Sequence, residues 1–327
     1  LYVMFYPQLV AGPIERPQNL LHQFREHHEA DPALIGSGLR LMAWGYFKKM
    51  VVADHLAVYV DKVFGNPTAF HGFPVIAAIL FFSFQIYCDF SGYSDIARGT
   101  ARVMGIQLMR NFNFPYFASS IREFWTRWHI SLSTWFRDYL YIPLGGNRVS
   151  AGRWCFNIML VFMLSGLWHG ANWTFLVWGA LHGLYMIAEY LKQRRTNTHG
   201  KYRPLAQMSF SGFLRLSLVF LLVSFGWIFF RAKNMDQAFE LIKNCTAGYH
   251  FFHPGLTTGI VSSFGFYTCV LGILALTGME ILLRFKNFRL RFMNWSSHYR
   301  VACYIMLCLT IVSLGVFNHY RFIYFQF

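Results

Sequence analysis

Long apolar stretches recur along the chain and are separated by shorter polar ones. A helix needs about 20 mainly apolar residues to cross the hydrocarbon core of a bilayer. Stretches of this kind lie at 39–63, 73–97, 153–170, 172–191, 211–231, 259–283 and 300–318. The first carries Lys48, Lys49 and Asp54, so we expect it to be tilted, broken or packed inside protein. The pattern predicts an all-α fold, a polytopic transmembrane helical bundle that forms one membrane-embedded domain over residues 1–327.

The beginning of the chain falls inside this pattern. Residues Leu1 to Ala11 have the character of the second half of an apolar segment. We therefore expect further sequence of the natural protein before Leu1, with residues 1–327 forming the C-terminal portion of a longer chain.

Composition supports the membrane class. Of the 327 residues, 55% are hydrophobic and 13% are charged, whereas soluble domains are typically about 25% charged. A soluble protein of this composition would have apolar faces that it could not cover. The formal net charge of +15 would suggest nucleic acid as a partner of a soluble protein. In a membrane protein we expect lipid instead, and no nucleic acid.

Basic residues concentrate in alternate loops. The segments rich in Lys and Arg are 98–153 with eight, 192–215 with six and 284–300 with five. By contrast, 64–72 has none and 232–258 has two. Because basic loops stay on the cytoplasmic side, this pattern predicts a multi-pass protein with the three basic segments inside the cell. The turn His169–Asn172 and the C-terminal Phe327 would then face outward.

The segment 98–152 is too polar to span a membrane but is dense in aromatic residues. These are Phe112, Phe114, Tyr116, Phe117, Phe124, Trp125, Trp128, Trp135, Phe136, Tyr139 and Tyr141. Arginine mixed with tryptophan and tyrosine is typical of the membrane interface, or of helices that dip into a protein-lined cavity. A solvated loop would need far fewer aromatic residues. We therefore expect interfacial or re-entrant helices here.

The densest cluster of functional side chains lies in this segment, in the run REFWTRWHISLSTWFRDY. On a continuous helix, Trp125, Trp128 and His129 would share one face through i, i+3 and i+4 spacing. Arg127 and Arg137 would point elsewhere and could bind anionic groups such as phosphates. An interfacial helix whose tryptophans only set its depth is an equally good interpretation.

A second cluster surrounds His169, in the run SGLWHGANW at the junction of two apolar stretches. An ionisable side chain at membrane depth is costly, so it is a functional candidate by default. Histidine can act as a general base near neutral pH because its unperturbed pKa is about 6.5. The alternative is a structural histidine bonded to a backbone carbonyl. His182, thirteen residues later, is more typical of packing inside the bundle.

Polar side chains also interrupt the stretch 73–97. Asp89 and Asp95 lie within it, and pairing with Arg98 or Arg102 would be the ordinary reason for two carboxylates at that depth. A role in lining a substrate path stays open.

Metal and nucleotide chemistry lack their usual signatures. The six cysteines form no CxxC pair and lie mostly in apolar runs, as is typical of small buried side chains. The sequence has no phosphate-binding glycine loop, no GxSxG and no HExxH. We expect no metal site.

The two central motifs resemble those of a known family. The run REFWTRWHISLSTWFRDYLYIPLGGNR (122–148) is similar to the signature of the membrane-bound O-acyltransferase family. The run MLSGLWHGANWTFLVWGALHG (163–183) is similar to the segment that carries the catalytic histidine of that family. The opening YPQLVAGPIERP and the ending FIYFQF resemble the bacterial branch that contains the alginate O-acetyltransferases.

The resemblance implies roles for individual residues. His169 corresponds to the near-invariant histidine of the family, and His129 lies where relatives have His or Asn. The family fold is a bundle of tilted helices around a cavity, which the donor enters from the cytoplasm and the acceptor from the far side. Arg122, Arg127, Arg137 and Trp125, near His129, would bind the donor.

The implied reaction is O-acetylation of an exported, alginate-like polysaccharide at the bacterial inner membrane. Acetyl-coenzyme A would be the donor, with no permanently bound cofactor. The acetyl group would reach the polysaccharide directly or through periplasmic acetyltransferase partner proteins. Because the same branch includes the D-alanyl transferases of teichoic acid, D-alanyl or other acyl transfer to a cell-envelope polymer stays open.

Two classes without acyl transfer also compete. A transporter would use intramembrane histidine and aspartate as well, but it should show inverted repeats with broken helices, and none is visible in the sequence. A binding-only membrane scaffold is compatible with the composition.

Overall fold

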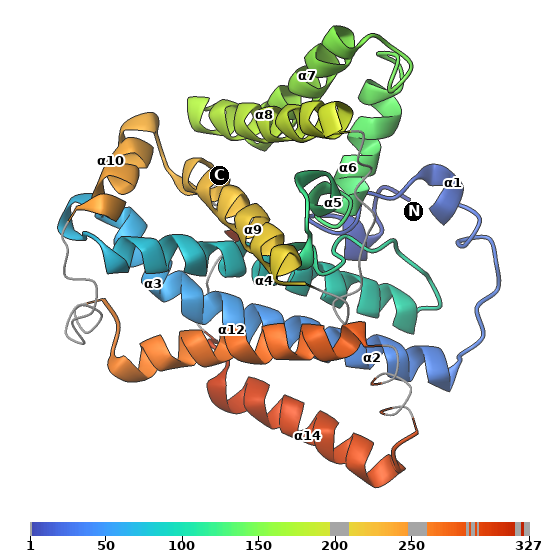
Figure 1. Cartoon of the computed structure of the whole chain (residues 1–327). Helices are drawn as coiled ribbons and strands as arrows, with labels where there is room; N and C mark the ends of the chain where they lie inside the picture. Colours follow the sequence, from blue (N-terminus) through green and yellow to red (C-terminus); the bar gives the residue numbers. More distant parts are fainter. Residues whose placement is uncertain are drawn as a thin grey trace. The chain divides into compact units, whose positions relative to one another are not determined.

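A computed structural model describes residues 2–196, 209–247, 260–285, 288, 292, 294–317 and 322–323. All regular secondary structure in this part of the chain is helical (Figure 1), which confirms the predicted all-α class. Contacts divide the chain into two units. Unit 1 holds the described residues of 1–66, 76–110 and 250–326, and unit 2 holds those of 67–75 and 111–249. The single domain over 1–327 stays a prediction.

Unit 1 is built on two long helical segments, the continuous run α2–η2–α3 and the helix α4. Its helices are η1 (Tyr6–Gln8), α1 (Pro17–Leu20), α2 (Pro32–Tyr46), η2 (Phe47–Ala53), α3 (Asp54–Gly65), all but the first turn of α4 (Phe73–Val103), α12 (Ser263–Arg284) and α14 (Ser297–Leu314). The element η2 is a π-helix that joins α2 to α3 without a break, so the predicted span 39–63 changes its helical geometry where its charged residues begin. Both α12 and α14 pack on η2.

Glycines bring α2 and α4 into close contact. A Cβ atom on Gly38 would lie 2.6 Å from the carbonyl oxygen of Gly99, and one on Gly45 would lie 2.7 Å from that of Gly92. Only glycine therefore allows the two backbones to approach this closely. The pairing runs in opposite directions along the two helices, so α2 and α4 are antiparallel at this contact.

This close contact places the lysines of η2 against the acidic residues of α4. Lys48 Nζ lies 2.6 Å from Asp95 Oδ2 and donates to Ser91 Oγ at 3.0 Å. Lys49 Nζ lies 2.5 Å from Asp89 Oδ1 and 2.8 Å from Asp54 Oδ1. Lys48, Lys49 and Asp54 thus pack against other protein groups, which is one of the three arrangements expected from the sequence.

The partners of the α4 carboxylates were only partly predicted. Arg98 does bind Asp95, at 3.2 Å, but the main partners are Lys48 and Lys49, which lie forty or more residues earlier. Asp89 also accepts the backbone N–H of Ile323 at 2.7 Å. No local spacing rule could identify these contacts, because they depend on the glycine-mediated approach of α2 to α4.

Unit 2 contains the segments that carry both histidine motifs. Its helices are η3 (Pro67–Ala69), η4 (Pro115–Phe117), α5 (Ile121–Trp125), α6 (Ile130–Phe136), η5 (Arg137–Tyr141), α7 (Ala151–His169), α8 (Trp173–Thr196), α9 (Phe210–Arg231) and α10 (Met235–Thr246). Helices α7 and α8 form an antiparallel hairpin, and α9 packs on α8 (Figure 1).

In the part of the chain that the structure describes, five helices are long and apolar enough to cross a membrane: α4, α7, α9, α12 and α14. They correspond to five of the seven predicted spans. The other two stretches are helical, in α2–η2–α3 and α8, but fall outside this group. In the first stretch, α2 has 15 residues and α3 has 12, so neither is long enough by itself. Helix α8 is long enough, with 24 residues, but its apolar sequence is interrupted by polar residues such as His182 and Glu189.

The prediction of buried cysteines is correct for Cys88 and Cys269 but wrong for Cys303 and Cys308, which are exposed. The latter two lie on α14, a helix with no buried residue and an apolar sequence. A surface of this kind suits contact with lipid, where a cysteine behaves as a small apolar side chain.

Candidate active site

His129 lies at the start of a helix rather than in the middle of one. Helix α5 ends at Trp125, and His129 is the N-cap of α6 with left-handed backbone angles, φ 42° and ψ 54°. The predicted shared face of Trp125, Trp128 and His129 is therefore wrong. The chain changes direction between the two short helices, so i, i+3 and i+4 spacing does not hold across the junction.

The backbone around His129 is held by a buried asparagine. The carbonyl oxygen of Asn111 accepts the N–H of Ile130 at 2.9 Å, and its side-chain Oδ1 accepts the N–H of Ser131 at 3.2 Å. These are the first N–H groups of α6, which have no partner within their own helix. Asn111 therefore fixes the direction of the first turn of α6, and with it the position of the His129 ring.

A second anchor ties α5 to α8. The carboxylate of Glu189, on α8, accepts the N–H groups of Ile121 at 2.8 Å and Arg122 at 3.3 Å. Ser120 caps the same helix by accepting from Glu123 N at 3.1 Å. The first turn of α5 is thereby docked on α8, and a carboxylate at a helix N-terminus is also electrostatically favourable.

His169 is the last residue of α7 and lies beside a tight turn into α8. A Cβ atom on Gly166 would lie 2.3 Å from the carbonyl oxygen of Phe175, and one on Gly179 would lie 2.3 Å from that of Phe162. Glycine at both positions therefore lets α7 and α8 pack backbone to backbone. This contact fixes where α7 ends and so where the imidazole of His169 lies.

The turn itself is tied to the chain after α9. Asn172 accepts the N–H of Thr174 through Oδ1 at 3.1 Å and donates from Nδ2 to the carbonyl oxygen of Lys233 at 2.8 Å. Asn172 thus holds the loop next to His169 both to the start of α8 and to the chain after α9.

The structure brings the two predicted catalytic histidines together. The Trp168 ring centroid lies 4.9 Å from that of His169 and 6.3 Å from that of His129. Burial, and secondly the nearby His169, lower the pKa of His129 well below its usual range. His129 is therefore neutral near pH 7, so it can donate or accept a hydrogen bond but is hard to protonate and is a weak base.

The two histidines differ in burial and in the side chains around them. His129 is buried and His169 is partly exposed, whereas Trp168 is 53% exposed and Trp173, at the start of α8, is 73% exposed. Aromatic rings enclose the rest of His169. Phe230, Trp178 and Phe175 lie 5.0, 5.3 and 6.4 Å from it. The imidazole of His169 therefore lies against aromatic rings from α8 and α9.

The predicted donor-binding residues do not form one group. Arg127 is buried, pairs with Glu123 and donates to the carbonyl oxygen of Phe114 at 3.3 Å. Arg122 and Arg137 are exposed, and Arg137 Nε lies 2.7 Å from Asp138 Oδ1. Trp125 packs in the interior, with its ring 5.0 Å from that of His182 and 5.1 Å from that of Phe162. These contacts favour structural roles for Arg127 and Trp125, and leave Arg122 and Arg137 available for an anion.

Comparison with known proteins gives the family. The model of the membrane-bound O-acyltransferase family matches residues 1–225. The chain belongs to the membrane-bound O-acyltransferase family.

Relatives of this chain are named for acyl transfer to alginate, peptidoglycan or teichoic acid. The chain is 43% identical over 242 residues to a probable alginate O-acetylase of Azotobacter vinelandii, a match that covers 73% of this chain and 46% of the relative. It is 40% identical over 245 residues to a peptidoglycan O-acetyltransferase of Helicobacter pylori, covering 74% and 45%. A teichoic acid D-alanyltransferase of Bacillus subtilis is 28% identical over 253 residues, covering 71% and 60%. The chain thus spans about half the length of its acetylating relatives.

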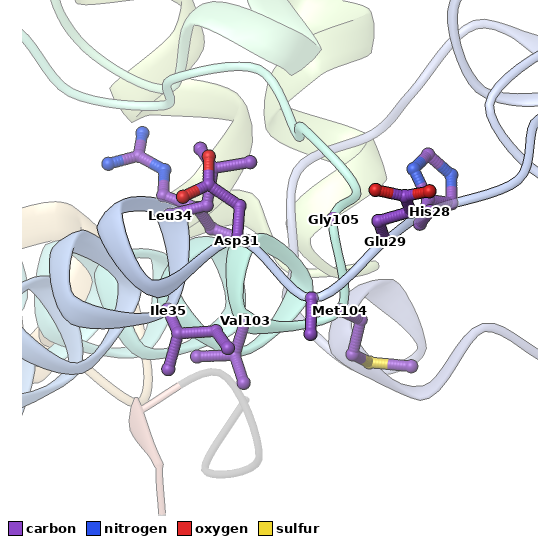
Figure 2. Close-up of a pocket in the computed structure, with 10 residues that line it drawn as sticks. His28, Glu29, Asp31, Leu34, Ile35, Val103, Met104 and Gly105 are labelled. Atoms are coloured by element: carbon purple, nitrogen blue, oxygen red, sulfur yellow. The ribbon is translucent and has the colours of Figure 1, made fainter.

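Unit 1 of this family member contains a small cavity of about 200 Å³. Figure 2 shows residues that line it, among them His28, Glu29 and Asp31 from the chain before α2, and Met104 and Gly105 from the chain after α4. None of the predicted catalytic or donor-binding residues lines it. No group of three histidine, cysteine or acidic residues that could hold a metal ion occurs in the described ranges.

Reasoning from the sequence found the two histidines but missed the residues that hold them. Asn111, Glu189 and Phe230 come from segments without a motif, and each acts through tertiary contacts. Of these three residues, Glu189 could have been identified from the sequence. It is an acidic residue near the end of an apolar stretch, and an acidic side chain in such a place usually has a specific partner.

Proposed function

We propose that this protein is a membrane O-acyltransferase that transfers an acetyl group from acetyl-coenzyme A to a hydroxyl group of an exported, alginate-like polysaccharide at the bacterial inner membrane. The observation that carries the proposal is the pairing of His129 and His169 around Trp168, at a partly exposed end of the α7–α8 hairpin. Membership of the family and the names of the acetylating relatives support it.

In the proposed reaction, His169 takes the proton of the acceptor hydroxyl as the oxygen attacks the thioester carbonyl. The tetrahedral intermediate then collapses, the carbon–sulfur bond breaks, and the thiolate of coenzyme A leaves. His169 returns its proton to that thiolate, so the reaction consumes and releases no net proton. A general base of this kind typically contributes 10²–10⁴-fold to the rate.

His129 has a different role in this mechanism. Since its lowered pKa keeps it neutral, it can donate a hydrogen bond to the thioester oxygen as negative charge develops there. Its rigid placement by Asn111 suits that role, because a preorganised donor does not have to move during the reaction. The exposed Arg122 and Arg137 would bind donor phosphates.

The proposed route of the acetyl group to the polysaccharide has two alternatives. The acetyl group passes to the polysaccharide directly or through periplasmic acetyltransferase proteins, and lipid surrounds the spanning helices. The orientation proposed from the basic loops places 98–152 inside the cell and the His169–Asn172 turn outside. The predicted outward position of Phe327 lies outside the described residues.

The test is a transfer assay in membranes from cells that make the natural protein. Membranes given acetyl-coenzyme A, labelled in the acetyl group, and a polyuronate acceptor should form labelled polymer and free coenzyme A thiol. Membranes that carry His169→Ala are the control. Label in neither polymer nor protein, with no thiol released, would refute acetyl transfer from this donor.

D-alanyl transfer is the second candidate, and the teichoic acid D-alanyltransferase relative is the observation that favours it. The same membranes given a D-alanyl thioester distinguish the two. Incorporation of D-alanine without incorporation of acetate would replace the first proposal by the second.

A further inference from the structure

The side chains around His169 leave little space beside its imidazole. Phe230 and Trp178 are each 1% exposed, and their ring centroids lie 5.0 and 5.3 Å from that of His169. Phe175, 6% exposed, lies 6.4 Å away. Three large buried rings from α8 and α9 therefore form a wall on the inner side of the histidine.

This wall is rigid because its members pack on one another. Phe230 lies 5.1 Å from Trp178, 5.2 Å from Phe175 and 5.2 Å from Trp227. Behind it, Trp178 packs against His182, which is fully buried. Protein interiors are close-packed, so rings held from several sides cannot move aside without a cost.

We propose that Phe230 and Trp178 restrict the acyl group to short chains such as acetyl. The inference rests on the proposed function, in which His169 is the base. The attacking hydroxyl must lie within hydrogen-bond distance of the imidazole, so the acyl carbonyl lies close to it too. The acyl chain then lies against the side chains that surround the histidine. On the inner side, the rings of Phe230 and Trp178 occupy the space that a longer chain would need.

The expected size of the effect follows from the energetics of apolar pockets. One methylene group that fits or fails to fit typically changes the specificity ratio 10–200-fold. Truncating Phe230 to alanine removes a whole ring and opens space for several methylene groups. The butyryl-to-acetyl ratio of kcat/KM should therefore rise at least about 10-fold in Phe230→Ala.

Phe229 provides a matched control. It lies on the same helix, is 5% exposed, and packs on Phe225 at 5.7 Å. The substitution Phe229→Ala removes the same volume from the interior and destabilises the protein by a similar mechanism. It does so at a ring that is not part of the wall, and it should leave the butyryl-to-acetyl ratio at the wild-type value.

The experiment measures coenzyme A thiol released in membranes containing the natural protein, supplied in turn with acetyl-, butyryl- and hexanoyl-coenzyme A. The wild type should use acetyl-coenzyme A and discriminate against the longer donors. Phe230→Ala should shift toward butyryl, and the milder Phe230→Leu, which is better tolerated in a packed core, should shift in the same direction by less.

The outcomes separate this inference from the proposed function. Equal use of all three donors by the wild type, or an unchanged ratio in a folded Phe230→Leu, would overturn the size limit while leaving acyl transfer intact. The same shift in Phe229→Ala as in Phe230→Ala would also overturn it, because general loosening would then be the cause. Failure of the wild type to use any thioester would refute the proposed function instead.

Discussion

Units 1 and 2 both bury polar side chains, but the surroundings of those side chains differ between the two units. In unit 1, the two lysines of η2 contact carboxylates: the buried Lys48 contacts Asp95, and the partly buried Lys49 contacts Asp54 and Asp89. In unit 2, the polar groups at the end of the α7–α8 hairpin are imidazoles enclosed by aromatic rings. Fixed ion pairs hold helices together, whereas an imidazole in an apolar wall can exchange a proton with a bound substrate. Burial of a polar side chain alone therefore does not identify an active site.

The largest expected effect is the loss of activity on removing the imidazole of His169. In His169→Ala, the general base is gone, and transfer should fall by about 10²–10⁴-fold. The α7–α8 contact depends on Gly166 and Gly179 rather than on this ring, so the amount of folded protein in the membrane should not change. Thiol release and gel-filtration of the solubilised protein measure the two quantities. An active variant would refute the catalytic role, and a misfolded one would support a structural role.

The second effect concerns the stability of unit 1. Replacing Lys49 by methionine leaves Asp54 and Asp89 buried without the ammonium group that neutralises them. Removing one partner of a buried ion pair typically costs about 3–5 kcal/mol. Thermal unfolding of the solubilised protein should show a clear decrease in Tm. The control is Lys243→Met, on the exposed side of α10, which should have almost no effect. Equal Tm values for the two variants would refute the structural role of the buried pairs.

A third prediction concerns the difference between the two histidines. Asparagine keeps a hydrogen-bond donor and an acceptor but does not titrate. If His129 only donates a hydrogen bond, His129→Asn should retain measurable activity, His129→Ala should lose much more, and His169→Asn should be inactive. The acidic limb of the pH–rate profile should persist in His129→Asn, because His169 determines it. Complete loss in both asparagine variants would mean that the histidines act together as the base.

The fourth prediction is a pH dependence of stability. The pKa of His129 is lowered in the folded protein, mainly by burial, while its unfolded value is near 6.5. The unfolded state therefore binds more protons below pH 6.5. The stability from the neutral imidazole is complete above this pH and is lost as the pH falls, by up to about 1.4 kcal/mol per pH unit. Tm measured between pH 7.5 and 5 should decrease less in His129→Asn than in the wild type. Identical slopes would contradict the lowered pKa.

The smallest expected effect distinguishes the arginines near the site. Arg137 is 58% exposed in its pair with Asp138, and exposed pairs contribute about 0–1 kcal/mol. Arg137→Met should thus leave Tm unchanged but raise the KM for acetyl-coenzyme A if the side chain binds a phosphate. Arg127→Met should instead lower Tm, because Arg127 is buried with Glu123. A lower Tm in Arg137→Met, with an unchanged KM, would remove Arg137 from the donor site.

The sequence was most informative where local pattern determines structure. Apolar length predicted α4, α7, α9, α12 and α14, because a helix in lipid must satisfy its backbone internally. The two histidine motifs also predicted residues that the fold does bring together. The approach of α2 to α4 could not be predicted, because it depends on glycines in segments with no other mark.

The turn at His129 was mispredicted for a related reason. Helical spacing assumes that a helix continues, but α5 ends after five residues. Its end is determined by tertiary anchors: Glu189 holds the start of α5, and Asn111 holds the start of α6. Periodicity within 122–139 contains no information about either anchor, so a sequence argument naturally extended the helix.

The left-handed backbone at His129 restricts the amino acids that this position can accept. With φ at 42°, most side chains are disfavoured, and glycine, asparagine, aspartate and histidine are the ones that tolerate it best. Glycine has no side chain to offer, and aspartate would place a negative charge in a buried position. Histidine and asparagine are what remain, and these are the two residues that the family resemblance implies here. The backbone conformation and then the chemistry of the site thus limit which substitutions this one position can accept during evolution.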